Sequence, residues 1–442
     1  MNLIRLFILI WFCLAFNLSG MAQDRQGPLC LTLRDALQKA NTINLQVMMA
    51  NARLEQAIAR ISQSRSDLLP KIDGVVSGSR QTSDLRAEGL QIPIPGFGTH
   101  VGPYNSFDAR PRVTVALFDP SAFERFQAAK KGKALSDAQL DKTREDVLAL
   151  VADLYIDAQR KQQSVNLLQT ILDRDQMAFD LSQDNYAQGT GTLLESNKLR
   201  SDLDQTKYLF YQAKLQAEDA GMDLEAALQI PLDTQLLFID DKIFLRALEN
   251  NTVTNFNNAT NADIALASSA LEARKADQKT AYADLLPKIS GTADYGRSGA
   301  SPGNGSNTYF VGVKATVPIW EGGAQQAKIK EANGELKEAQ EDLLDATQQA
   351  QVNVAKARLA IEGTNDLREA KLQARQTAQK SLSIAFHSQE IGSGSVFEVM
   401  LAKAGLALAE DEYNEAQAAW VMAHIDLLHA QGRLRELVKK GE

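Results

Sequence analysis

Two long stretches of this 442-residue chain contain no proline. One lies between Pro120 and Pro231, and the other follows Pro318. Proline interrupts helices because its ring clashes with the preceding turn and its nitrogen carries no hydrogen. Both stretches are rich in Ala, Gln, Leu, Lys and Glu, which favour helices. We therefore predict two unusually long helices, over 121–187 and 321–391, each about 100 Å long at 1.5 Å per residue.

Shorter helical patterns flank each of these long helices. Each flanking pair adds up to about the length of the long helix beside it, so we predict that its two members stack end to end. The pairs cover about 33–67 with 193–228, and about 262–285 with 395–437. Thr32 and Asp35 have the spacing of a capping box and predict the start of the first helix.

Two proline-containing windows, about 72–118 and 289–320, have a different pattern. Apolar and polar residues alternate there, as at Ile289, Ala293 and Tyr295. A period of two residues predicts strands. Gly, Pro, Ser and Asn between the alternating segments predict loops. Each window therefore predicts a strand, a loop and a second strand, which gives four strands per chain.

The chain contains an internal duplication. Residues 44–72 align with 261–289 at an offset of 217, and eleven of the 29 aligned positions are identical. Both segments end in the run Asp-Leu-Leu-Pro-Lys-Ile. A second match joins the Gly-rich segments 189–195 and 392–398. Self-similarity at a fixed offset indicates repeated structural units, and each unit here predicts a helix, a strand pair and a long helical hairpin.

The first 22 residues predict a secretory signal peptide. Arg5 precedes an apolar run over 6–16, and Gly20-Met21-Ala22 is a small-x-small cleavage site. The remaining chain is predicted to consist of a first repeat, a connector and a second repeat. Their boundaries are 23–230, 231–260 and 261–442.

No later segment reaches the 18 consecutive apolar residues typical of a membrane-spanning helix. Four strands cannot close a barrel alone, and open sheet edges are not tolerated in a bilayer. Several chains that share one barrel would satisfy both constraints. Aromatic residues near the strand windows would then form an interfacial girdle; the alternative is a sandwich whose core they fill. These residues are Phe97, Tyr104, Phe107, Phe118, Tyr295, Tyr309, Phe310 and Trp320.

These patterns together resemble the TolC-like outer-membrane efflux proteins over about 31–437. The motifs that carry the resemblance are Leu31-Thr32-Leu33, the two Leu-Leu-Pro-Lys-Ile runs, Val317-Pro318-Ile319-Trp320 and the two Gly-rich turns. The resemblance implies a mainly α fold with a small β part. Duplicated helical hairpins would form a trimeric α-barrel, and four strands per chain would contribute to a shared twelve-stranded transmembrane β-barrel.

The resemblance also implies a function. The chain would be a homotrimeric channel in the outer membrane of a Gram-negative envelope, with a large periplasmic part. It would carry small molecules such as drugs passively from a periplasmic adaptor and an inner-membrane pump to the exterior. The alternatives are the outer-membrane duct of a type I protein secretion system, or a periplasmic coiled-coil adaptor or scaffold.

Two acidic residues are candidates for a pore constriction. The family often carries an acid shortly after the Gly of each hairpin tip, and Glu195 and Glu398 hold that position here. Copies of Glu398 from three chains could form a negative ring that attracts cations. The alternative is that both acids only favour the start of their helices. A second acid and an arginine known in the family are replaced by Leu401 and Gly394, which argues against a double ring and an arginine lock.

The hairpin tips are also the candidate docking site for the adaptor. The alternative is that they are only helix–helix turns. The candidate residues are Gly189, Thr190, Gly191, Gly392, Ser393 and Gly394. The Asn-rich connector 231–260 would form an equatorial belt, as in the family, or would be a plain linker between the repeats.

Other classes of function find little support in the sequence. The net charge of −8 argues against a nucleic-acid surface, which needs a basic stripe. His424 and His429 are five residues apart, so they do not share a helical face as a metal pair would, and we interpret them as lone polar positions. The sequence contains no P-loop, dinucleotide fingerprint or nucleophile elbow. We therefore predict no enzyme activity, no cofactor and no metal.

Overall fold

The computed structural model describes residues 29–84, 100–232, 234–239 and 261–439. Its two longest helices are α4 (Pro120–Ala187) and α8 (Ala324–Glu390), of 68 and 67 residues. Each is followed by a tight turn and a returning helix, α5 (Leu193–Ala227) or α9 (Val396–Ala430). The two long helices predicted from the proline distribution are confirmed.

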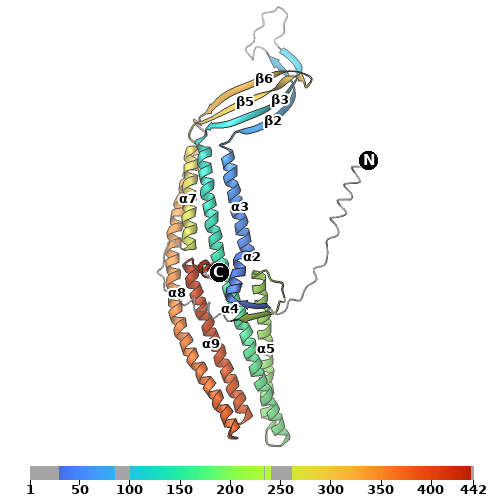
Figure 1. Ribbon diagram of the computed structural model, residues 1–442, viewed down its shortest axis with the longest axis vertical. Helices are drawn as coiled ribbons and strands as arrows, with labels where there is room; N and C mark the ends of the chain where they lie inside the picture. Colours follow the sequence, from blue (N-terminus) through green and yellow to red (C-terminus); the bar gives the residue numbers. More distant parts are fainter. Residues whose placement is uncertain (1–28, 85–99, 233, 240–260, 440–442) are drawn as a thin grey trace, which may run out of the picture.

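A sheet forms one end of the elongated molecule, and the turns after α4 and α8 form the other end (Figure 1). Helices α3 (Leu45–Ser66) and α7 (Ala262–Ala283) lie beside the long helices in the half nearer the sheet. Helices α5 and α9 lie in the half that ends at the turns.

Two asparagines join the short helices end to end. Asn44 caps α3, since its side-chain oxygen accepts from the amide of Gln46 at 2.9 Å. Its side-chain nitrogen donates to the carbonyl of Ala227, the last residue of α5, at 2.9 Å. Asn261 begins α7 in the same way and donates to the carbonyl of Ala430, the last residue of α9, at 2.7 Å. These bonds confirm the predicted stacking of α3 on α5 and of α7 on α9.

Three predicted helix boundaries are wrong. The helix predicted over 33–67 is two helices, α2 (Leu33–Ile43) and α3, because the backbone of Asn44 is extended (φ −64°, ψ 135°). The helix predicted over 395–437 ends at Ala430; Gly432 has φ +67°, and a short helix, α10 (Leu434–Lys439), follows. Helix α8 begins three residues later than predicted, since Gly322 and Gly323 have positive φ.

The four predicted strands form one antiparallel sheet in the order β2-β3-β5-β6. They are β2 (Lys71–Asp84), β3 (His100–Phe118), β5 (Lys288–Ser301) and β6 (Asn304–Thr316). The middle pair, β3 and β5, joins the two predicted repeats. Strands β2 and β6 are the edges, and each is at least 13 residues long.

A second, two-stranded sheet was not predicted. Strand β1 (Leu29–Thr32) pairs in parallel with β4 (Leu236–Ile239), which lies in the connector. The hydroxyl of Tyr155 on α4 donates to the carbonyls of Leu31 at 3.0 Å and Ile239 at 3.3 Å. This sheet therefore lies against α4, midway along the molecule (Figure 1).

The main hydrophobic core lies at this middle level, where α2, α4, α5 and α9 meet the small sheet. Its largest fully buried side chains include Leu31, Leu37, Leu148, Leu224 and Ile425. Elsewhere the buried helix positions are mostly alanines, which allow close helix packing. The chain is mainly helical with a small β part, as predicted. None of the described helices has an apolar stretch long enough to cross a membrane.

Candidate functional site

The two hairpin tips have the same backbone geometry. Gly189 and Gly392 lie two residues after the last residue of α4 and α8, and they have φ of +75° and +76°. This left-handed conformation is strained for residues with a side chain. Glycine therefore allows each long helix to end in an αL turn, which is a common helix terminus.

The tip hydrogen bonds also repeat. At the first tip, the amides of Thr190 and Gly191 both donate to the carbonyl of Asn185, at 2.9 and 3.0 Å. At the second tip, the amides of Ser393 and Gly394 both donate to the carbonyl of Ser388, at 2.9 Å each. The hydroxyls of Thr190 and Ser393 bond the same carbonyls, at 3.0 and 3.2 Å.

The third tip residue is glycine in both turns for a steric reason. A Cβ built on Gly191 would lie 3.1 Å from Asn185 Cβ, and one built on Gly394 would lie 3.0 Å from Ser388 Cβ. The side chains at positions 190 and 393 are instead exposed at the end of the molecule. The structure thus brings the six candidate docking residues to two similar tips at one end.

The two acidic candidates differ in their local contacts. Glu398 completes a capping box: Ser395 Oγ accepts from the Glu398 amide at 3.1 Å, and Glu398 Oε2 accepts from the Ser395 amide at 2.9 Å. Glu195 shares only the first of these bonds, from its amide to Thr192 Oγ1 at 3.2 Å. Both side chains are exposed. Helix capping explains why position 398 is acidic. The negative ring of Glu398 side chains at a pore constriction stays a prediction.

One face of the four-stranded sheet is apolar and exposed. Directly opposed residues in an antiparallel sheet share a face, and the row Ile72, Val113, Ala293, Val311 crosses all four strands. Ile72 and Val311 are 73% and 74% exposed. Tyr295 and Tyr309 form an opposed pair on this face and are also exposed. We call this surface, which contains the row and the tyrosine pair, the apolar face.

The opposite face carries charged residues that bond across strands. Arg110 on β3 bonds Asp108 at 2.7 Å and Asp294 on β5 at 2.8 Å. Arg112 reaches the other oxygen of Asp294 at 3.3 Å. The Asp294 side chain is only 4% exposed, so its charge is almost fully enclosed by the two arginines. We call this surface the polar face.

A second charged cluster lies at the middle of the molecule. Glu145 on α4 is 1% exposed and accepts from the backbone amides of Leu434 and Arg435 at 2.9 and 3.2 Å, and from Arg435 Nε at 2.9 Å. Arg435 also bonds Asp141. Burial raises the pKa of Glu145, and these donors counteract that rise only in part. No local pattern in the sequence predicts this cluster, because its members are about 290 positions apart.

His429 on α9 belongs to the same cluster. Its Nε2 lies 3.1 Å from Asp146 Oδ1, and this contact raises the pKa of His429. The interpretation of His429 as a lone polar position is therefore wrong. His424 makes two contacts with Trp420: its ring lies 4.2 Å from the Trp420 ring, and its Nδ1 is 2.9 Å from the Trp420 carbonyl.

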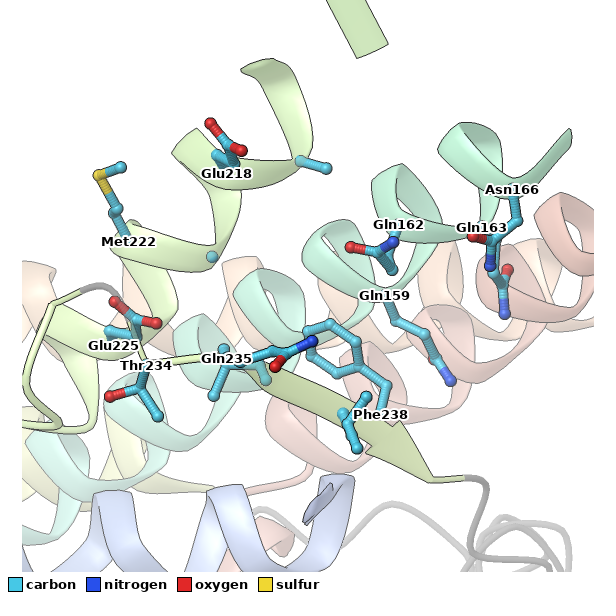
Figure 2. A pocket seen from close by; sticks show the side chains of 14 residues that line it. Gln159, Gln162, Gln163, Asn166, Glu218, Met222, Glu225, Thr234, Gln235 and Phe238 are labelled. Atoms are coloured by element: carbon cyan, nitrogen blue, oxygen red, sulfur yellow. The ribbon is translucent and has the colours of Figure 1, made fainter. Parts of the chain in front are cut away.

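An open cleft of about 810 Å³ lies between α4, α5 and β4. Figure 2 shows side chains from all three elements around it, with Gln159, Gln162 and Gln163 contributed by α4. Met222 and Phe238 add apolar surface. Side-chain amides both donate and accept hydrogen bonds, so this lining suits contact with a polypeptide backbone.

Large apolar side chains are exposed on the outer helices α5 and α8. On α5, Tyr208, Tyr211 and Leu215 follow one another at helical spacing and are each more than 60% exposed. On α8, Val352 and Leu359 are seven residues apart and also exposed. In the half of the molecule near the tips, α5 and α8 lie at opposite sides of the helix layer (Figure 1). Both lateral edges of one chain thus present apolar surface that no described residue covers.

Comparison with known proteins gives consistent results. The family model described as outer membrane efflux protein matches residues 36–228 and 258–433. The pyoverdine export outer membrane protein OpmQ of Pseudomonas putida is 25% identical over 393 residues, which is 87% of this chain and 82% of OpmQ. The alkaline protease secretion protein AprF of Pseudomonas aeruginosa is 22% identical over 340 residues, 75% of this chain and 70% of AprF.

Solved structures share the fold. The outer membrane channel CmeC of Campylobacter jejuni superposes with a TM-score of 0.75 at 18% identity, covering 92% of this chain and 88% of CmeC. The outer membrane protein VceC of Vibrio cholerae gives a TM-score of 0.69 at 17% identity, covering 90% of this chain and 96% of VceC.

Proposed function

The chain belongs to the outer membrane efflux protein family, and from this membership we propose that it is an outer-membrane channel. It is a passive conduit that carries small molecules from a periplasmic adaptor and an inner-membrane pump to the exterior. It moves its cargo without catalysing a reaction on it. Export of the chain would use residues 1–22 as a signal peptide, which lie outside the described residues.

The observation that carries this proposal is the two-faced sheet. Its apolar face exposes Ile72, Val311 and the Tyr295–Tyr309 pair, whereas its polar face encloses Asp294 between two arginines. Membrane strands of a channel alternate in this way, with apolar residues toward lipid and polar residues toward a water-filled interior. An ordinary sandwich core would instead bury the apolar face.

Open edges support a trimer. Among the described residues, no strand pairs with the outer edges of β2 and β6, and an open edge is not tolerated in lipid. If β6 of one copy pairs with β2 of the next, three copies close a shared twelve-stranded barrel. The exposed apolar side chains on α5 and α8 would meet in the same arrangement and close a helical barrel below it.

The tips are the proposed periplasmic end of the conduit. The side chains of Thr190 and Ser393 extend from turns of identical hydrogen bonding, which gives an adaptor two similar contact points per chain. Glu398 and Glu195, one turn inside the tips, are the proposed constriction. The repeats 23–230 and 261–442 each contribute one tip.

The connector 231–260 is the proposed equatorial region. Its described strand β4 binds β1 and lies against α4 midway along the molecule. The adjacent cleft, lined by amides of α4, offers a contact surface at the same level. Residues 240–260 of the connector lie outside the described residues.

A second cargo class fits the same channel. The similarity to AprF, whose name refers to alkaline protease secretion, extends over 75% of this chain. A type I secretion duct would need the same barrel and the same tips. A strain that lacks the chain distinguishes the two: increased sensitivity to small toxic compounds supports efflux, and loss of one secreted protein at normal sensitivity supports secretion.

Electron microscopy of the detergent-solubilised outer-membrane fraction tests the channel itself. We expect a threefold hollow cylinder with a helical part about 100 Å long. A periplasmic particle, or a solid rod without a lumen, would overturn the proposal and favour an adaptor or scaffold.

A further inference from the structure

Arg80 and Arg297 occupy equivalent positions in the two hairpins of the sheet. Arg80 lies nine residues after Lys71, the first residue of β2. Arg297 lies nine residues after Lys288, the first residue of β5. The two arginines are separated by 217 positions, which is the offset of the internal duplication. The same charge is therefore placed at the same level of both hairpins.

The residue opposite each arginine is also the same. Arg80 faces Asn105 on β3, and Arg297 faces Asn307 on β6. Directly opposed side chains in an antiparallel pair are close enough to act on one ligand. Each hairpin thus carries one Arg–Asn pair.

Both pairs lie on the apolar face. Residues two apart on a strand point to the same side, and Arg297 is two positions beyond Tyr295, while Arg80 is four beyond Val76. Val76 belongs to this face because it is four positions beyond Ile72. The two arginines thus add positive charge to the apolar face, beyond its apolar residues.

Contacts of Arg297 hold its side chain on this face. Its Nε donates to the carbonyl of Gly305 on β6 at 2.9 Å. A Cβ built on Gly305 would lie 3.1 Å from Arg297 Cγ, so glycine leaves the space that the arginine stem occupies. The residue is nevertheless exposed. Its Nε is therefore held against β6, while the residue as a whole stays exposed.

The charge of the arginines is not neutralised nearby. Within the described part of the chain, neither Arg80 nor Arg297 forms an ion pair with a carboxylate. Asp84, further along β2, lies 3.5 Å from His100. The arginines on the polar face, in contrast, are bonded to Asp108 and Asp294.

The level of the arginines matches the edge of a membrane. Nine residues at about 3.3 Å each span about 30 Å along a strand. With the strand tilt of about 35–45° usual in such barrels, this corresponds to roughly 21–24 Å of height, close to the apolar band of about 25 Å. Lys71 and Lys288 lie at the end of the sheet next to helices α3 and α7. Arg80 and Arg297 therefore lie at the opposite boundary of the apolar band.

We infer that Arg80 and Arg297, each with its opposed asparagine, bind phosphate groups of lipid headgroups in the outer leaflet. Guanidinium groups bind phosphate oxygens in a bidentate manner, and the asparagine amides supply further donors. This inference rests on the proposed function, since it requires the apolar face to contact lipid. In a trimer the sites form a ring of six arginines.

The test measures binding of fluorescent lipid A to the full protein in neutral detergent. The double variant Arg80→Gln/Arg297→Gln should raise the half-saturating lipid concentration about fivefold for each arginine removed. Arg80→Lys/Arg297→Lys should fall between the wild type and the double Gln variant, because the charge remains but the bidentate geometry is lost. The matched control Arg60→Gln/Arg200→Gln removes two exposed helical arginines and should leave the binding unchanged.

Two results would overturn the inference. One is equal lipid A binding by the wild type and the double Gln variant. The other is full competition by inorganic phosphate at the same phosphate concentration, which would show an anion site without lipid selectivity. Flotation of both proteins with phosphatidylcholine vesicles tests membrane insertion separately, and a wild type that does not float would contradict the proposed function itself.

Discussion

Glu145 and Arg435 are 290 positions apart in the chain and form two hydrogen bonds with each other. The buried carboxylate accepts from the Arg435 side chain at 2.9 Å and from its backbone amide at 3.2 Å. With the further bond from the Leu434 amide, a side chain of α4 caps the first turn of α10. Helix α10 is thus attached to the middle of the molecule by Glu145, by the bond from Arg435 to Asp141, and by the buried side chains of Leu434 and Val438.

Replacement of Glu145 by Ala should weaken the attachment of α10. The amides of Leu434 and Arg435 would lose their acceptor, and a buried unsatisfied group costs about 1–3 kcal/mol. We expect faster trypsin cleavage at Arg435 and faster hydrogen exchange in α10. Glu436→Ala, which removes an exposed acid on α10 itself, is the control and should change little. Equal protection in both variants would contradict the attachment.

The contact between His429 and Asp146 should make stability depend on pH. The hydrogen bond to Asp146 raises the pKa of His429; burial, Glu145 and Lys142 are the other influences on it. A raised histidine pKa gives stability that is fully present below about pH 6.5, the unfolded value, and lost as pH rises through the folded value. Thermal unfolding measured from about pH 6 to about pH 9 should show this loss.

The variant His429→Gln is the control for this pH dependence. Glutamine cannot gain a proton, so the unfolding temperature should change less over the same range. Asp426 on the same helix also faces His429, and its raised pKa makes a separate contribution below the histidine range. An identical pH profile for the wild type and the variant would show that His429 does not contribute.

A charge on the apolar face should prevent membrane insertion. Val311→Lys places a cation on β6 opposite Ala293, which lies about midway along β5 between Lys288 and Arg297. A cation at the middle of the bilayer costs about 2–4 kcal/mol in membrane barrels. We expect a reduced yield of trimers in the outer-membrane fraction. Thr292→Lys is the matched control, since Thr292 lies one position from Ala293 and on the polar face. Equal yields would mean that the apolar face does not contact lipid.

Removal of the two acids near the tips should weaken cation preference. Glu398→Gln combined with Glu195→Gln neutralises the proposed constriction, and Gln still suits the third position of a capping box, so the helix starts are retained. The measurement is the reversal potential of single channels in a planar bilayer under a salt gradient. Unchanged selectivity would assign both residues to helix capping alone.

Large charged side chains at the tips should prevent assembly with the pump. Gly189 and Gly392 are poor choices for this test because their positive φ makes any substitution strained. Thr190→Arg with Ser393→Arg changes exposed side chains instead. We expect trimers in the membrane but loss of export and of adaptor copurification. Normal export would exclude the tips as the docking site.

The long helices and the four strands could be predicted because their signals are local. The absence of proline over tens of residues and the alternation at Ile289, Ala293 and Tyr295 need no knowledge of partners. The tip turns were equally visible, since only glycine is free to adopt the left-handed conformation at 189 and 392.

The rest depends on contacts between distant segments. The break at Asn44 satisfies the carbonyl of Ala227, which is 183 positions away. The parallel pairing of β1 with β4 involves strands of four residues, too short to show a period. In the sequence, Glu145 is one of many acidic residues on a helix. Only the fold brings Arg435 next to it. The alignment of Asn44 with Asn261, which does precede a helix, was the one signal that could have revealed the break.

The two asparagine junctions have a mechanical consequence. A push along the molecule at its tips passes from α5 to α3 across Asn44, and from α9 to α7 across Asn261. The uninterrupted helices α4 and α8 bear the same load through continuous backbone hydrogen bonds. At the level of the asparagines, α4 and α8 are continuous, whereas the stacked pairs beside them are interrupted. Bending and twisting of the helical layer will therefore concentrate at this level.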